Sequence, residues 1–174
     1  MALKHNLLHR DIKPGNILFN GDNEPKLVDF GLARNAEMEQ EADNVTWGTP
    51  YYVAPEKIKR ERETFLSDMY SLGGTLYHAV TGHVPFEAPT VEELVSAHVH
   101  TALTPPNLVV PEITKLTSDA LVKVMGKDPR ERFLSYEDFR MALEEARSKL
   151  LIQQSTQGGA AKASVKSKTS WWRR

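Results

Sequence analysis

The sequence predicts a mainly α-helical domain with one short β-hairpin. Apolar residues recur at helical spacing, between recognisable capping residues, in four segments. These segments are residues 67–81, 90–100, 116–125 and 135–150. The hairpin is predicted by apolar runs at 17–19 and 26–28, because the residues between them are rich in Asn, Asp, Gly and Pro.

The most informative stretch is residues 9–16, which places a carboxylate, an ammonium group and a carboxamide close together at Asp11, Lys13 and Asn16. A proline and a glycine precede Asn16, so a shaped loop is predicted rather than a helix. The hairpin that follows would return Asp29 beside Asn16, and their oxygen atoms suit Mg²⁺. A base, a phosphate-pairing cation and a cation site are what phosphoryl transfer to a hydroxyl requires.

The segments around these motifs carry weaker patterns. Residues 1–8 are expected to be the last turn of a helix, and residues 32–53, which lack periodicity, a long loop. His98 and His100 are two residues apart and so do not share a helix face. We expect them at the surface rather than at a metal ion.

The composition is that of a soluble globular chain and excludes several classes of protein. The 174 residues are 40% hydrophobic and 26% charged, which is sufficient for one domain with a core. The net charge of −1 gives no indication of nucleic-acid binding. The absence of cysteine excludes disulfides and suits a reducing cytoplasm. No run of about 18 apolar residues is present, so we expect no membrane-spanning helix.

Three ordered motifs carry a resemblance to a known family: residues 9–16, Asp29-Phe30-Gly31 and Ala54-Pro55-Glu56. They match the patterns H-R-D-x-x-x-x-N, D-F-G and A-P-E. The chain resembles the C-terminal lobe of a eukaryotic-like (Hanks-type) serine/threonine protein kinase, and it is similar to the bacterial members of that family. The resemblance implies helices F to I of that lobe within a domain over residues 1–150. No glycine-rich loop or strand lysine precedes the first motif, so the N-terminal lobe is expected to be absent.

The resemblance implies a role for each motif residue. Asp11 would orient or accept the proton of a substrate hydroxyl, and Lys13 would neutralise the γ-phosphoryl group of ATP. Thr49 would bond to both of them. Asn16 and Asp29 would hold Mg²⁺ and, with Lys13, the nucleotide. Structural or regulatory roles would fall to His9, Arg10, Phe30, Gly31, Thr46, Glu56, Asp68 and Arg132.

Two of these assignments leave an alternative open. By the resemblance, Asp68 would bond the backbone of the first motif, but an acid in the first turn of a helix is also favoured by the helix dipole. Glu56 and Arg132 would form a buried ion pair, whose rupture costs about 3–5 kcal/mol. The alternative is a pair of surface charges worth less than about 1 kcal/mol.

The chain departs from the family pattern at two positions. Arg10 would pair with a phosphorylated threonine four residues before Thr49, but that position is Val45, and Thr46 is one residue out of register. Activation by loop phosphorylation is therefore a hypothesis. Gly15 stands where arginine-directed kinases often carry glutamate, so we predict no strong preference for basic residues before the phosphorylated site.

Two functions follow from these observations. The first is a serine/threonine kinase that transfers the γ-phosphoryl group of ATP to protein hydroxyls and is present here as a partial catalytic domain. The second is a catalytically inactive lobe that acts as a binding or regulatory module. The expected partners are a protein substrate and the missing N-terminal lobe or a longer parent chain. The expected location is the cytoplasm, with a membrane tether in a longer parent left open.

Residues 151–174 are predicted to form a disordered basic tail. After Ile152 the composition changes to Gln, Ser, Gly, Ala and Lys, with five basic residues and no acid. The last four residues, Trp171-Trp172-Arg173-Arg174, suit a membrane interface. An arbitrary tail is the simpler interpretation and the one that we expect.

Overall fold

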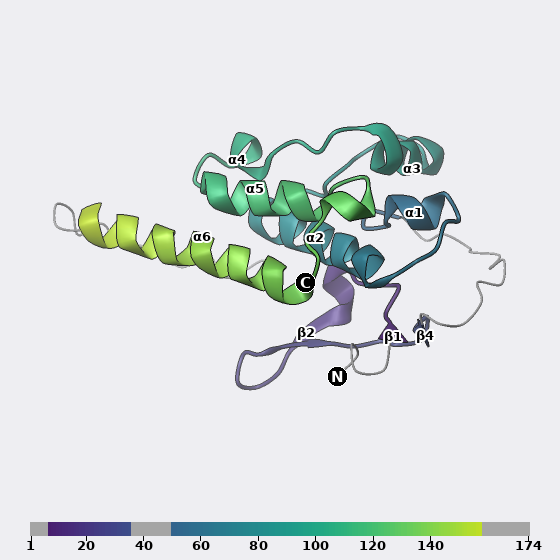
Figure 1. Ribbon diagram of the computed structural model, residues 1–174, viewed down its shortest axis with the longest axis horizontal. Coiled ribbons are helices and arrows are strands. Elements are labelled where there is room, and N and C mark those ends of the chain that lie inside the picture. Colours follow the sequence, from purple (N-terminus) through teal and green to yellow (C-terminus); the bar gives the residue numbers. More distant parts are fainter. Residues whose placement is uncertain (1–6, 36–49, 158–174) are drawn as a thin grey trace.

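The computed structural model describes residues 7–35 and 50–157, which form a helical body and two small antiparallel strand pairs (Figure 1). The mainly helical architecture with a hairpin is confirmed. In chain order the elements are β1 (Leu7–Leu8), η2 (Pro14–Asn16), β2 (Ile17–Phe19), β3 (Pro25–Leu27), β4 (Arg34–Asn35), α1 (Pro55–Ile58), α2 (Phe65–Thr81), α3 (Val91–His100), α4 (Pro106–Val109), α5 (Lys115–Val124), η3 (Pro129–Glu131) and α6 (Tyr136–Gln157).

Helix α2 lies between the strands on one side and helices α3 and α4 on the other (Figure 1). It begins two residues earlier than expected because Thr64 caps it. The Thr64 hydroxyl accepts a hydrogen bond from the Leu66 amide, and the Ser67 hydroxyl accepts one from the Thr64 amide, both at 3.2 Å. The helix ends where Gly82 adopts a φ of +77° and its amide donates to the His78 carbonyl.

Close contact between α2 and α5 depends on a glycine. A Cβ atom at Gly73 would lie 2.5 Å from Val124 Cγ1, so any side chain there would push the two helices apart. Met69 and Tyr70 on α2 and Leu121 on α5 are at most 1% exposed. The packing of α2 against α5 is therefore the centre of the core, and α6 covers α5 from outside.

Helix α3 contradicts the prediction that both of its histidines lie at the surface. His100 is exposed, but His98 is 0% exposed because it shares the buried face of the helix with Leu94, four residues earlier. The His98 Nδ1 atom shares a hydrogen bond of 3.0 Å with the Tyr70 hydroxyl, and the ring meets Phe86 edge-on. Burial, with a contribution from a nearby lysine, lowers the pKa of His98 to about 4.

Two segment boundaries also differ from expectation. Leu7 and Leu8 form strand β1 rather than a helical turn, because they pair with β4, part of the expected loop. Helix α6 continues to Gln157, since residues 151–157 contain helix-forming Leu, Ile and Gln and no glycine until Gly158. The predicted disorder is therefore wrong for residues 151–157. Residues 158–174 lie outside the described part, and there the prediction remains untested.

No helix in the described ranges combines the length and apolarity needed to cross a bilayer.

Candidate active site

The loop of residues 9–16 is fixed to the helical body by Asp68 at the start of α2. Its carboxylate accepts hydrogen bonds from the backbone amides of His9 at 2.6 Å and Arg10 at 2.8 Å. Burial raises the pKa of Asp68, and the two amide bonds counteract that rise. The hydrogen bonds that the resemblance implies for Asp68 are thus present. An acid that interacted only with the helix dipole would not make them.

Asp11, Lys13 and Asn16 converge on one carboxylate oxygen. The Lys13 ammonium donates to Asp11 Oδ2 at 2.7 Å, and the Asn16 side-chain amide donates to the same atom at 2.9 Å. The Asn16 amide also donates to the Asp11 backbone carbonyl at 2.8 Å. Within the described residues Asp11 Oδ1 accepts no hydrogen bond, and the Asp11 side chain is 29% exposed. Asp11 is therefore oriented through one oxygen, and its side chain remains partly exposed.

His9 connects this loop to the Asp29-Phe30-Gly31 turn. Its ring is buried, its Nε2 atom lies 3.0 Å from the Val28 carbonyl oxygen, and the Phe30 ring packs edge-on at 4.8 Å. The Asp11 amide lies 3.4 Å from His9 Nδ1. These contacts assign the Nε2–H tautomer, in which Nδ1 accepts and Nε2 donates.

The hairpin brings Val28, the residue before Asp29, to the backbone of Asn16. Strands β2 and β3 pair Ile17 with Leu27, and the Val28 amide donates to the Asn16 carbonyl at 2.9 Å. Asp29 is exposed and has a φ of +62°, with its Oδ1 atom accepting from the Gly31 amide at 3.2 Å. Since the Asn16 amide nitrogen is used by Asp11, its carbonyl oxygen and the Asp29 carboxylate are the donors left for a cation. Two hard oxygen donors fit Mg²⁺.

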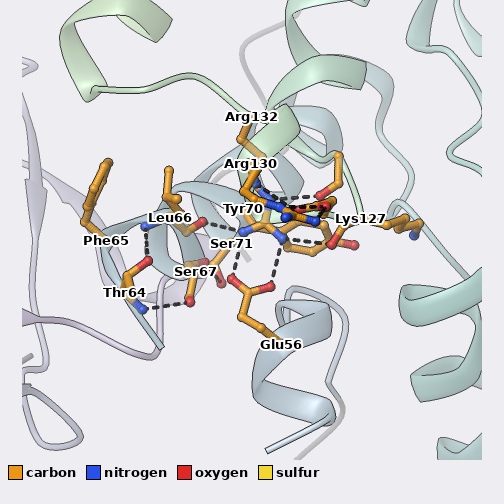
Figure 2. Close-up of polar contacts among 12 residues, drawn as sticks. Glu56, Thr64, Phe65, Leu66, Ser67, Tyr70, Ser71, Lys127, Arg130 and Arg132 are labelled. Carbon is orange, nitrogen blue, oxygen red and sulfur yellow. Dashed lines mark hydrogen bonds and ion pairs between the residues drawn. The ribbon is translucent and has the colours of Figure 1, made fainter. Parts of the chain in front are cut away.

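Glu56 and Arg132 form a fully buried ion pair (Figure 2). Two parallel bonds of 2.8 Å join the guanidinium to the carboxylate, and the two side chains are 0% and 3% exposed. Arg132 also donates to the carbonyls of Leu66 and Gly126, at 2.7 and 2.8 Å. Burial raises the pKa of Glu56, but the bonds from Arg132 outweigh it, and the net pKa is lowered. Of the two alternatives, the structure shows the buried pair.

Arg10 makes a contact that the sequence did not indicate. Its guanidinium binds Glu63, which lies in the charged segment between α1 and α2 and is only 7% exposed. Such charged runs are usually solvated, so no local signal pointed to this burial. Thr46 and Thr49 lie outside the described residues.

The loop and hairpin border an apolar pocket of about 440 Å³. It is lined from the strand side by Leu7, Ile17, Leu27 and Phe30, and from the helix side by Phe65, Leu72 and Tyr136. Three further apolar side chains of residues 7–35 are largely exposed, namely Leu18 (55%), Phe19 (52%) and Leu32 (57%), and none of them lines the pocket. The described residues thus expose apolar surface in addition to the pocket.

Comparison with known proteins accounts for this combination of loop, turn and ion pair. The profile of the family described as the protein kinase domain matches residues 2–144. The chain belongs to this family. The expected resemblance to bacterial serine/threonine kinases is also confirmed by its relatives.

One relative of this kinase-family chain is a probable serine/threonine-protein kinase, PknB of Bifidobacterium longum. It is 35% identical over 138 residues, which are 77% of this chain and 20% of the relative. PknH of Mycobacterium bovis is 34% identical over 143 residues, or 82% and 24%. PknK of Mycobacterium tuberculosis is 38% identical over 130 residues, or 72% and 11%. The chain therefore spans about a quarter or less of the length of these curated relatives.

Proposed function

We propose that this chain carries the hydroxyl-orienting and cation-binding part of a serine/threonine protein kinase. The observation that supports it most is the convergence of Lys13 and Asn16 on one oxygen of Asp11, on a loop whose backbone is held by Asp68. A carboxylate with one oxygen anchored and the other accessible can orient a serine or threonine hydroxyl. Protein substrates bearing such hydroxyls are the partners that this chemistry fits.

Lys13 has two functions in this proposal. Its ammonium neutralises Asp11 in the absence of substrate and lies beside the position that a transferring phosphoryl group would occupy. A positioned cation of this kind typically contributes about 3 kcal/mol to stabilising charge that develops in the transition state. Thr49, by the family resemblance, would complete this contact.

Asn16 and Asp29 are the residues that would hold Mg²⁺ with the phosphates of ATP. The ion would neutralise phosphate charge and fix the phosphate oxygens in place. His9 supports this role because it joins the Asp29 turn to the Asp11 loop through Val28 and Phe30. The two groups are therefore positioned as one unit rather than as two independent loops.

The exposed apolar side chains Leu18, Phe19 and Leu32 favour completion of the nucleotide site by a second surface. Ligand sites commonly bury about 70–90% of a small ligand, and one wall cannot achieve this. We propose that an N-terminal lobe, or a longer parent chain, supplies the second wall. An inactive lobe that only binds a partner is the alternative, and the same exposed side chains would serve it.

Three finer proposals concern regulation, selectivity and location. Phosphorylation of Thr46 would add a further anion for Arg10, and mass spectrometry of active protein tests it. Gly15 supports a lack of preference for basic residues before the target site, which a peptide array tests. The cysteine-free sequence supports a location in the reducing cytoplasm.

Calorimetric titration of the purified chain with ATP and Mg²⁺ tests the proposed function. Because the chain alone offers only part of the nucleotide site, we expect any binding to be weak and Mg²⁺-dependent, to be abolished by Asp29→Ala, and to be unchanged by Asp22→Ala, an exposed acid in the hairpin turn. Where binding is seen, serine and threonine peptides should be phosphorylated by the wild type and not by Asp11→Asn. Absence of binding by a folded chain would support the inactive lobe, or a site that forms only in the longer parent.

A further inference from the structure

The guanidinium of Arg10 is held by a carboxylate of the chain itself. Arg10 Nη2 donates to Glu63 Oε1 at 2.7 Å, and Nε lies 3.2 and 3.3 Å from the two carboxylate oxygens. The two side chains are 12% and 8% exposed. A charge-assisted bond between two nearly buried groups is among the stronger polar contacts in a protein.

The burial of Glu63 requires compensating positive charge. An ionised carboxylate withdrawn from water is costly unless it is paired. Besides Arg10, the Lys57 ammonium lies 4.0 Å from Glu63 Oε2, and its side chain is 14% exposed. Two cations from different parts of the chain therefore meet at one acid, which joins the loop of residues 9–16 to the segment between α1 and α2.

Arg10 is also fixed through its backbone. Its amide donates to Asp68 at 2.8 Å, and its carbonyl accepts from the Lys57 ammonium at 2.9 Å. The residue has a φ of +68°, a left-handed conformation that non-glycine residues hold only where the surroundings enforce it. Because Arg10 directly precedes Asp11, this enforced backbone direction sets where the Asp11 side chain begins.

We propose that Glu63 is a positioning residue for Asp11. It holds Arg10 by a charge encoded in the sequence, so that the loop is ordered without a phosphate group added to the chain. The catalytic part of this inference rests on the proposed function, whereas its structural part does not. It also gives an outcome distinct from the hypothesis in which a phosphorylated Thr46 supplies the anion.

Amide hydrogen exchange tests the structural part on the whole chain. Glu63→Gln keeps the shape of the side chain and removes its charge. Exchange at the His9 and Arg10 amides should accelerate by about tenfold or more, because their hydrogen bonds to Asp68 lose the support of the Arg10–Glu63 contact. Exchange within α5 should not change. Glu112→Gln, an exposed acid elsewhere, is the matched control and should match the wild type. Unchanged exchange at His9 and Arg10, or equal acceleration in α5, would overturn the proposal.

Glu63→Asp, which keeps the charge on a shorter side chain, provides a second variant. It should retain more protection at His9 and Arg10 than Glu63→Gln does. Equal loss in the two variants would show that shape rather than charge matters, and would overturn the proposal.

Phosphotransfer tests the catalytic part. Wherever the wild type is active, Glu63→Gln should lower kcat with little change in KM for ATP, and phosphatase-treated wild type should keep its rate. A rate that depends on a loop phosphate would overturn the proposal. If the wild type shows no phosphotransfer, the proposed function fails for this chain, and hydrogen exchange still decides the role of Glu63.

Discussion

The helical body (residues 50–157) and the segment that we propose to be catalytic (residues 7–35, the catalytic segment) differ in how completely they bury their apolar residues. In the helical body, even a charged pair, Glu56 with Arg132, lies completely inside. In the catalytic segment, large apolar side chains such as Leu18 and Phe30 are about half exposed. The body also leaves apolar side chains exposed, for example Leu134 (81%), but it closes a core of its own, whereas among the described apolar residues of the segment only Leu8 and Ile12 are buried.

This difference indicates which region contributes most of the folding free energy and which region carries the proposed functional groups. The body closes its own core around α2 and α5, so its buried apolar side chains pack against one another. The segment is held chiefly by polar anchors, with Asp68 and Glu63 binding its loop. Substitutions in the two regions should therefore differ in stability effect even where the residue types match.

The largest effect is expected for Arg132→Met in the helical body. The change leaves Glu56 buried without its partner, so the free energy of unfolding should fall by about 3–5 kcal/mol. Chemical denaturation measures it. Arg130→Met is the matched control, because Arg130 pairs with Asp128 at the surface with its side chain 89% exposed, and it should change stability little. Similar losses in the two variants would contradict the buried pair.

His98 should make the stability of the body depend on pH. Its pKa falls from an ordinary value of 6.5 to about 4 on folding, so the unfolded chain takes up a proton there first as pH drops. Stability should therefore decline between pH 6.5 and 4, by about 3 kcal/mol from this residue.

Denaturation at a series of pH values measures this dependence. The decline should be shallower in His98→Gln, whatever that change does to stability at pH 7. His100→Gln, which alters an exposed histidine, should keep the wild-type slope. An unchanged slope in His98→Gln would show that His98 is not the group responsible.

Gly73→Ala should destabilise the body by about 1–3 kcal/mol, because the new methyl group would overlap Val124. Thermal and chemical denaturation both report it. Gly21→Ala, in the hairpin turn, is the control, since nothing lies within 4 Å of the added atom. A neutral result at Gly73 would show that α2 and α5 can separate without loss.

The smallest effect is expected for Leu18→Thr in the catalytic segment. The residue is 55% exposed and threonine keeps the strand preference, so stability should change by no more than about 0.5 kcal/mol. The same type of change at buried Leu121 should cost about 2–5 kcal/mol. A large loss at Leu18 in a denaturation experiment would mean that its side chain is covered in solution.

Local signals in the sequence were sufficient for most ends of the four predicted helices, but they did not indicate the short helices α1 and α4. Thr90 and Ser135 each accept a bond from the amide three residues later, as their positions before apolar runs predicted. The meeting of Glu56 with Arg132, 76 residues apart, was available only through the family resemblance. Helical periodicity says nothing about which distant charges meet.

The failures of prediction also have physical causes. The burial of His98 could have been predicted from Leu94, which lies four residues earlier on the same helix face. The prediction considered only the spacing between His98 and His100, which says nothing about burial. The pairing of β1 with β4 joins two-residue strands that carry no periodic signal of their own. Glu63 lies in a charged run that predicts a solvent-exposed segment. In the folded chain, Arg10 and Lys57 approach Glu63 and allow it to be buried.

Three residues of the catalytic segment have a left-handed backbone: Asn23 in the hairpin turn, and Arg10 and Asp29 in the proposed site, where backbone cost and side-chain chemistry meet in single positions. Each holds a backbone conformation that costs a side-chain-bearing residue on the order of 1–2 kcal/mol and glycine almost nothing. Asp29→Gly would relieve that cost and delete a carboxylate, whereas Arg10→Gly would also leave the buried Glu63 without its guanidinium partner. Selection for stability alone would therefore favour glycine at position 29 but not at position 10, where the side chain offsets the cost of its own backbone conformation.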